Sequence, residues 1–167
     1  MSKRSTPFRM RRSILHLAVG GVIAAMYAAL SMVNIPISFF QFRPAEALTV
    51  LPIFTPAAVP GLFVGCLLAN YLTGCLWQDI VFGSVATLLG AILTRLLRKR
   101  PLLAVLPPVL TNGAIIPPIL IFVYAVPDGY FFLLASVVVG EILSASVLGY
   151  FLYRASKPFF EKKLHLA

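Results

Sequence analysis

The sequence has little charge, and negative charge is the scarcest. Only 5 of the 167 residues are Asp or Glu, and charged residues of both signs make up 11% of the chain. Soluble domains carry about 25%. Hydrophobic residues make up 60%. A water-soluble fold of this length cannot bury so many apolar side chains, so the composition predicts one domain of a multi-spanning membrane protein.

Residues that would indicate catalysis or a metal centre are also missing. Cys66 and Cys75 form no C-x-x-C pair, and core packing explains a cysteine inside an apolar run. The sequence contains no P-loop, no H-E-x-x-H and no G-x-S-x-G motif, and His16 and His165 stand alone. We therefore predict that the chain is not an enzyme and carries no cofactor or metal.

The positive charge is confined to short stretches beside apolar segments. The net charge is +9, and 13 of the 14 basic residues lie in three clusters. This is the pattern of cytoplasmic flanks, with some contact to anionic lipid, and it argues against nucleic-acid binding. The clusters are Lys3, Arg4, Arg9, Arg11 and Arg12; Arg95, Arg98, Lys99 and Arg100; and Arg154, Lys157, Lys162 and Lys163.

The apolar segments predict an all-α bundle of six transmembrane helices. An even number of spans puts the three basic clusters on one side, so we expect a multi-pass protein of the cell membrane with both termini cytoplasmic. The membrane domain would cover 14–154, between basic tails at 1–13 and 155–167. Whether 46–74 forms two short spans, divided at Pro60-Gly61, or one long helix stays open. The expected spans are 14–33, 46–58, 61–74, 80–97, 102–126 and 130–153.

The remaining charges gather toward the outer half of this bundle. Arg43, Glu46, Asp79 and Asp128 fall at outer span ends or in outer loops, and Glu141 lies inside the sixth span. A lipid-facing charge at such depth costs several kcal/mol, so these groups are expected to face inward and to be paired or to bind something. Asp128, in Pro-Asp-Gly, is most simply a turn residue.

Several of these polar residues can also have a purely structural role. Arg43 and Glu46 have helix-neighbour spacing and can pair with each other, although Pro44 disfavours helical backbone at Arg43. Asp79 can cap the fourth span. The prolines around Asn112, at 107–108 and 117–118, indicate either freed carbonyls facing a cavity or a merely kinked helix.

The first span carries a double-width stripe of small residues. Small side chains let helix backbones approach closely, so the stripe can pack inside the bundle or contact another protein. Its two i, i+4 rows are Gly20, Ala24 and Ala28, and Gly21, Ala25 and Ala29.

Four stretches, taken in order and spacing, resemble the QueT family, the substrate-binding (S) components of energy-coupling factor (ECF) transporters assigned to queuosine precursors. They are QFRPAEALT (41–49), PGLFVGCLLAN (60–70), DIVFGSVATLLGAILT (79–94) and the Gly140-Glu141 pair. The resemblance runs over most of 12–154, is dense in 41–94 and is loose at PPVLTNG (107–113). It implies a six-helix bundle of the ECF S-component type.

The resemblance also implies partners. An ECF transmembrane subunit and two ATPase subunits would supply the energy, which fits the missing P-loop. The first helix of S components typically meets the transmembrane subunit through an Ala-x-x-x-Ala face, which would here use Ala24, Ala25, Ala28 and Ala29.

The ligand implied is a 7-deazaguanine, either preQ0, preQ1 or queuine, captured outside and delivered to the cytoplasm. Carboxylates accept from the donors of a guanine-like edge, amides read a carbonyl and an amine together, and aromatic rings stack on flat rings. Residues 34–45 would form a lid. The expected ligand-binding residues are Arg43, Glu46, Asn70, Trp77, Asp79, Asn112 and Glu141.

Two other classes of function stay open. One is a self-sufficient carrier or channel for a vitamin-like molecule, coupled to ions through Glu141 as a proton site, which would work without ATPase partners. The other is a structural subunit of a larger membrane complex, which would bind no small molecule.

Overall fold

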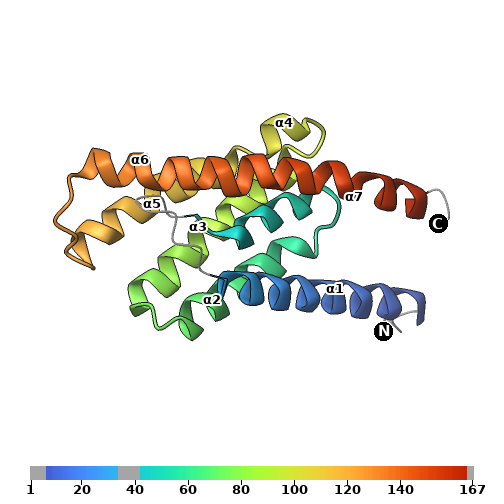
Figure 1. Ribbon diagram of the computed structural model, residues 1–167. Helices are drawn as coiled ribbons and strands as arrows, with labels where there is room; N and C mark the ends of the chain where they lie inside the picture. Colours follow the sequence, from blue (N-terminus) through green and yellow to red (C-terminus); the bar gives the residue numbers. More distant parts are fainter. Residues whose placement is uncertain (1–6, 34–41, 165–167) are drawn as a thin grey trace.

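The structure, a computed structural model, describes residues 7–33 and 42–164, with side chains for 13–33 and 42–160. All regular elements in this part of the chain are helical (Figure 1). The elements are α1 (Pro7–Ser31), η1 (Pro44–Ile53), α2 (Ala58–Leu72), α3 (Trp77–Leu96), α4 (Pro101–Ala104), α5 (Pro107–Phe122), α6 (Tyr130–Glu141), η2 (Ile142–Leu148) and α7 (Gly149–Leu164).

Four helices are long and apolar enough to cross a membrane, so the predicted all-α membrane fold is confirmed but the count of six spanning helices is not. The four are Ser13–Ser31, Trp77–Leu96, Pro101–Phe122 and Tyr130–Phe160. Residues 46–74 form two short helices, η1 with 10 residues and α2 with 15. Fifteen residues reach about 22 Å, short of a hydrocarbon core of about 30 Å.

Prolines mark where several of these helices begin. Pro44, Pro101 and Pro107 each stand at the first helical position, where the missing N–H has no partner to lose. Arg43, just before Pro44, is extended with φ −116° and ψ 103°, as the following proline predicted. Pro60 was expected to end a span, but it lies in the first turn of α2, so the break comes earlier, at 54–57.

The short helix η1 is enclosed by the rest of the bundle. It packs against α1, α3, α7 and η2. It is a 3₁₀-helix, and the last carbonyls of a helix have no partner within the helix itself. Arg95 meets this need, because its Nη1 donates to the carbonyl oxygens of Pro52 at 2.9 Å and Ile53 at 3.0 Å. One of the basic residues assigned to a cytoplasmic flank therefore supports the interior of the fold.

Helices α1 and α2 approach closely through glycine. A Cβ added at Gly61 would stand 2.6 Å from the carbonyl oxygen of Gly20, and one at Gly65 would stand 2.8 Å from Cβ of Tyr27 and 2.9 Å from the carbonyl oxygen of Ala24. Real side chains do not tolerate such distances. The packing therefore requires glycine on α2 and fixes the position of Tyr27 on α1.

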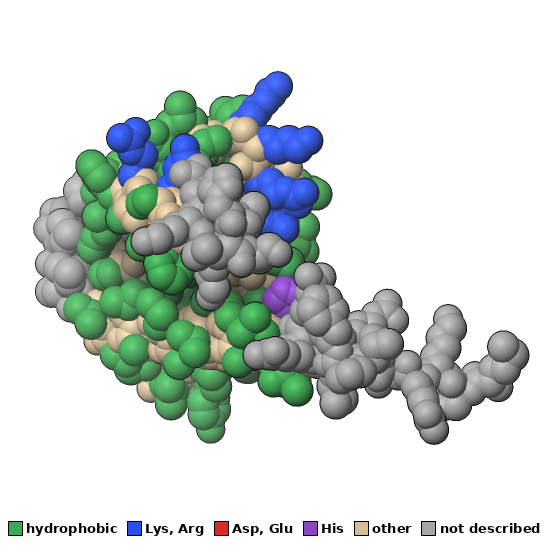
Figure 2. Space-filling model, turned by 90° about the vertical axis from the view of Figure 1, so that its right-hand side faces the viewer, with side chains coloured by type: hydrophobic (Ala, Val, Ile, Leu, Met, Phe, Trp, Pro, Cys, Tyr) green, Lys and Arg blue, Asp and Glu red, His purple; other side chains and the backbone are tan. Residues whose placement is uncertain are grey.

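Both ends of the helical bundle are distinct (Figure 1). Helix α1 begins and α7 ends at one end, while the α5–α6 connection lies at the opposite end. Figure 2 looks at the first of these ends and shows Lys and Arg side chains gathered on it, with no acidic side chain in view among the described residues. Helices α6, η2 and α7 form one continuous helix from Tyr130 to Leu164, which extends past the predicted span end at 153.

Candidate functional site

A carboxyl group on η1 is buried near the centre of the bundle. Glu46 is only 2% exposed, and Tyr27 on α1 donates its hydroxyl hydrogen to Glu46 Oε1. No described donor reaches the other oxygen, Oε2. A buried acceptor without a donor costs about 1–3 kcal/mol, and more when it is charged. Glu46 is therefore held in place through one oxygen and offers the second.

A second carboxyl group repeats this arrangement from the other side. Glu141, at the end of α6, is 6% exposed. The side-chain amide of Asn112 on α5 donates to Glu141 Oε1 at 2.8 Å, while Glu141 Oε2 has no described partner. Two buried carboxyl groups from distant parts of the sequence thus each have one oxygen that accepts no hydrogen bond, which we call the open oxygen.

Arg43 belongs to the same cluster. Its guanidinium lies within electrostatic range of Glu46 and Asp79, and also of Glu141. The side chain is half-buried. No described side chain forms an ion pair or hydrogen bond with it, so the Arg43–Glu46 pair that the sequence offered as a structural alternative is not formed, although the Glu46 N–H donates to the Arg43 carbonyl at 3.0 Å. The five donors of this guanidinium therefore remain available within electrostatic range of Glu46 and Glu141.

Asn70 and Asp79 form a neighbouring polar group at the junction of α2 and α3. The Asn70 amide donates to the backbone carbonyl of Asp79 at 3.4 Å. Asp79 Oδ2 accepts from the hydroxyl of Tyr124 at 3.2 Å, and that hydroxyl accepts from the Leu76 N–H at 3.2 Å. Burial raises the pKa of Tyr124, which keeps this hydroxyl protonated as a donor.

Asp79 stands in the first turn of α3 without capping it. The N-cap residue is Leu76, which makes no side-chain cap, and Asp79 lies three residues later, where its charge suits the helix dipole. The carboxylate faces Tyr124 rather than the free N–H groups of its own helix. Its role therefore includes joining α3 to the α5–α6 connection.

The expected ligand-binding residues thus divide into three placements. Glu46, Asn112 and Glu141 are buried and form one cluster with the half-buried Arg43, and Asn70 and Asp79 lie beside it. Trp77 is 66% exposed at the start of α3. The expected lid at 34–45 falls mainly on 34–41, which lie outside the described residues.

Unusual backbone accompanies both open carboxyl groups. Glu46 stands on a 3₁₀-helix of ten residues, whereas such helices seldom exceed four. Glu141 is followed directly by η2, a π-helix of seven residues. Helix η1 packs against η2. Irregular helices that persist in a packed core are frequent at functional sites, which marks this junction independently of its charges.

Tyr27 holds Glu46 of this cluster and Tyr124 holds the neighbouring Asp79, and sequence reasoning missed both tyrosines. Tyr27 had a detectable signal, because it is the one large polar-tipped side chain among the small residues 20–29 of the first span. Tyr124 had none, because a tyrosine near a span end is usual at a membrane interface. Among the described residues, no group of three His, Cys, Asp or Glu side chains is placed to hold a metal ion.

The sequence profile of the QueT transporter family matches residues 17–158, which include every residue of this cluster. The chain belongs to the QueT transporter family. It is therefore a membrane transport protein for a small molecule, and its family is not an enzyme family. Comparisons with curated proteins and with solved structures gave no match.

Proposed function

We propose that this QueT-family protein is the substrate-binding S component of an ECF importer and binds a 7-deazaguanine in the cluster of Arg43, Glu46, Asn112 and Glu141. The observation that carries the proposal is the pair of buried carboxylate oxygens, Glu46 Oε2 and Glu141 Oε2, that lack donors. A buried acceptor without a donor lowers the stability of an apolar bundle, and a ligand that donates hydrogen bonds to it restores that stability.

A guanine-like edge matches these atoms chemically. It carries a ring N–H beside an exocyclic amine, and carboxylates accept from such donors. Because Tyr27 and Asn112 already occupy the Oε1 atoms, each glutamate offers its Oε2, and the two donors of one ligand can be shared between them. The Arg43 guanidinium is then available for the ring carbonyl.

The excess of carboxyl groups over basic groups in the cluster favours a ligand that carries a positive charge, because such a ligand stabilises the ionised form of a buried carboxyl group. Glu46, Glu141 and the nearby Asp79 outnumber the single guanidinium of Arg43. Among the queuosine precursors, preQ1 carries an aminomethyl cation and preQ0 a neutral nitrile. A carboxylate pairs with the cation and gains nothing comparable from the nitrile. We therefore expect preQ1 to bind more tightly than preQ0.

One row of the small-residue stripe on α1 is exposed and available for the proposed contact with an ECF transmembrane subunit. Ala24 and Ala28 are covered, at 5% and 9% exposed, whereas Ala25 and Ala29 are exposed and a Cβ added at Gly21 would have nothing within 4 Å. Only 17% of the span Ser13–Ser31 is buried, against 39–50% for the other three. The row of Gly21, Ala25 and Ala29 is thus the part of the stripe that remains for a partner.

The deciding experiment is ligand binding to the purified chain. Thermal-shift and calorimetric titrations with preQ1, preQ0, queuine, guanine and riboflavin should show stabilisation by deazapurines, strongest with preQ1, and none with riboflavin. Uptake in cells should require co-expression of the ECF transmembrane and ATPase subunits. Absence of any deazapurine response would reject the ligand, and uptake without the ATPases would reject the S-component assignment.

A further inference from the structure

The polar group at the junction of α2 and α3 lies over a glycine. Asn70 on α2 and Asp79 on α3 are 3% and 7% exposed. A Cβ added at Gly83 would stand 3.2 Å from both Asn70 Nδ2 and Asp79 Oδ1. Ile116 of α5 comes next, with its Cδ1 3.8 Å from that Cβ. A buried amide and a buried carboxyl group therefore lie together over the bare backbone of Gly83.

Both of these polar side chains have an oxygen that accepts no hydrogen bond from a described residue. Asp79 accepts from the Tyr124 hydroxyl through Oδ2 at 3.2 Å, which leaves its Oδ1 open. Asn70 donates through Nδ2 to the Asp79 backbone carbonyl at 3.4 Å and to Cys66 Sγ at 3.6 Å, which leaves its own Oδ1 open. The group therefore offers two acceptor oxygens, one of them on an acidic side chain.

This polar group is connected to the carboxylate cluster through Cys66. That cysteine stands one turn before Asn70 on α2, and its sulfur accepts from the Asn70 amide at 3.6 Å. The Tyr27 hydroxyl, which donates to Glu46, lies within hydrogen-bonding reach of the same sulfur. Side-chain contacts therefore connect Asp79 with Glu46 through α2, which is the arrangement that a ligand with polar groups at both ends requires.

A primary ammonium group fits the two open acceptors. It carries three donors and no acceptor, like the end of a lysine side chain. A hydrogen bond between a cation and a carboxylate is about twice as strong as one between neutral groups. The Tyr124 hydroxyl gives Asp79 only a neutral hydrogen bond, and Arg43 lies within electrostatic range without forming an ion pair. A cationic ligand would supply the charged partner that Asp79 lacks among the described residues.

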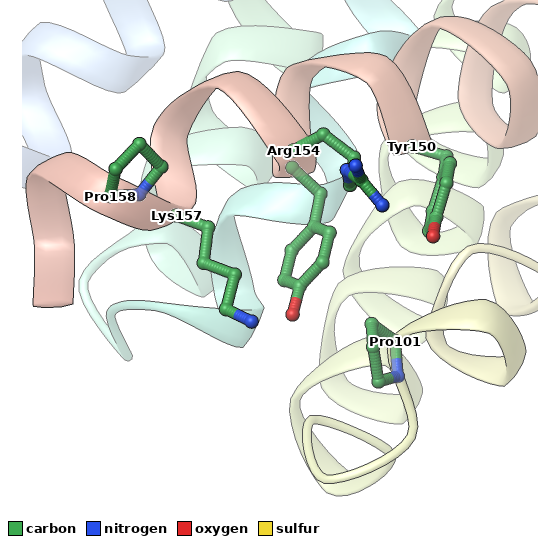
Figure 3. Close-up of a pocket in the computed structure, with 6 residues that line it drawn as sticks. Pro101, Tyr150, Arg154, Lys157 and Pro158 are labelled. Carbon is green, nitrogen blue, oxygen red and sulfur yellow. The ribbon is translucent and has the colours of Figure 1, made fainter.

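The basic end of the molecule offers no comparable carboxylate. A groove of about 460 Å³ lies there between α7 and the start of α4. Figure 3 shows the side chains of Arg154 and Lys157 beside Tyr150 on the α7 side of this groove. None of its described lining residues is acidic, so a cationic group finds no carboxylate among them. These residues are Pro101, Tyr150, Tyr153, Arg154, Lys157 and Pro158.

We propose that Asn70, Asp79 and Gly83 form an ammonium subsite of the ligand-binding site, and this assignment rests on the function proposed above. The ring donors of a 7-deazaguanine bind Glu46 and Glu141. A primary amine on its 7-substituent binds Asp79 Oδ1 and Asn70 Oδ1. Gly83 determines this specificity, because a side chain there would lie against both polar groups and displace them.

Two ligands that differ only in the amine test this subsite on the full purified chain. The first, preQ1, carries an aminomethyl group where the second, 7-methyl-7-deazaguanine, carries a methyl group. We expect calorimetric titration to show at least about tenfold tighter binding of preQ1 by the wild type. Asp79→Asn keeps an oxygen for Tyr124 but exchanges the open oxygen for an NH2 group. It should weaken preQ1 binding about 10- to 100-fold and change 7-methyl-7-deazaguanine binding less than about twofold.

The possible outcomes separate the subsite from the proposed function. Equal affinity of the wild type for the two ligands, or equal losses of both in Asp79→Asn, would overturn the subsite and leave the deazaguanine function standing. Binding of neither ligand by the wild type would reject the function itself, and the subsite with it.

A control and a second variant complete the test. Asp128→Asn makes the same exchange at an exposed residue outside the polar network, and it should leave both affinities within about twofold. Gly83→Ala keeps every polar group, but its Cβ would stand 3.2 Å from Asn70 Nδ2 and Asp79 Oδ1. We expect it to reduce the preference for preQ1 at least about fivefold, while thermal melts without ligand show a folded chain. A wild-type preference in Gly83→Ala would overturn the assignment of Gly83.

Discussion

At the scale of single residues, the protein holds each of two buried carboxyl groups through one oxygen and leaves the other open. Tyr27 holds Glu46, and Asn112 holds Glu141 at 2.8 Å. A purely structural carboxylate in an apolar bundle would be fully satisfied, because every missing bond lowers stability. Two incomplete ones near a single guanidinium are better explained as acceptors prepared for a ligand.

Replacing the open carboxylate oxygen of Glu141 with an NH2 group tests this explanation. In Glu141→Gln, the new Oε1 can still accept from Asn112, but the open acceptor becomes an N–H donor that repels a ligand donor. We expect deazapurine affinity to fall about 10- to 100-fold, a loss of about 1.5–3 kcal/mol, while the thermal midpoint without ligand is unchanged or rises.

Calorimetric titration of preQ1 against the wild type and Glu141→Gln measures this loss. Asp128→Asn is the matched control, because it makes the same change from carboxylate to amide at an exposed residue outside the cluster, and it should leave affinity within about twofold. Unchanged affinity in Glu141→Gln would remove that residue from the binding site.

At the scale of elements, the glycine contact between α1 and α2 positions the polar cluster. Gly65 lies against Tyr27, and Tyr27 holds Glu46 on η1, so one side chain makes both a helix-packing contact and the hydrogen bond to a carboxyl group that we propose binds the ligand. Arg95 completes the support by binding the last carbonyls of η1. The 3₁₀-helix therefore owes its place to α1 and α3 more than to its own hydrogen bonds.

Gly65→Ala should therefore affect binding from a distance. The added Cβ would stand 2.8 Å from Cβ of Tyr27, so α1 must move and carry the tyrosine away from Glu46. We expect a loss of about 1–3 kcal/mol in stability together with weaker ligand binding.

Gly21→Ala is the matched control, because nothing lies within 4 Å of its added Cβ. It should keep the stability and the ligand affinity of the wild type, or gain slightly in helix stability. Thermal melts and titrations of the two variants in the same detergent compare them directly. Wild-type stability in Gly65→Ala would mean that α1 and α2 do not approach as closely as described.

At the scale of the whole molecule, the bundle has a polar centre, a basic end and one loosely covered helix. Helix α1 is joined to the rest mainly through α2 and η1, and its outer row of small residues is left bare. A bare small-residue row in a membrane favours a helix of another protein, because close backbone approach gains contacts that lipid cannot provide.

Ala25→Leu with Ala29→Leu should impair assembly with the ECF transmembrane subunit and leave deazapurine binding intact. Ala25→Ser with Ala29→Ser keeps small side chains and should assemble normally. Ala24→Leu with Ala28→Leu should instead destabilise the isolated chain, because those positions are covered by α2. Co-purification with the ECF subunits measures the first two, and normal assembly of the leucine variant would place the interface elsewhere.

The sequence by itself determined the membrane class, the helical fold, the basic end and most of the polar cluster. Composition excludes a water-soluble protein. A carboxylate inside an apolar segment, such as Glu141, stands out because placing it at membrane depth costs free energy. Proline at position 44 even predicted the extended backbone of Arg43.

Only the tertiary structure decided which polar groups meet and which row of α1 is free. Contacts such as Tyr27 with Glu46, or Arg95 with Pro52, join residues 19 and 43 positions apart, and no local pattern encodes them. The sequence left open whether 46–74 forms two short spans or one long helix, and only the structure decided for two short helices, because a short apolar helix is stable at membrane depth only when neighbouring helices enclose its polar ends. Periodicity specifies the faces of a helix, whereas the packing of all helices together decides what each face meets.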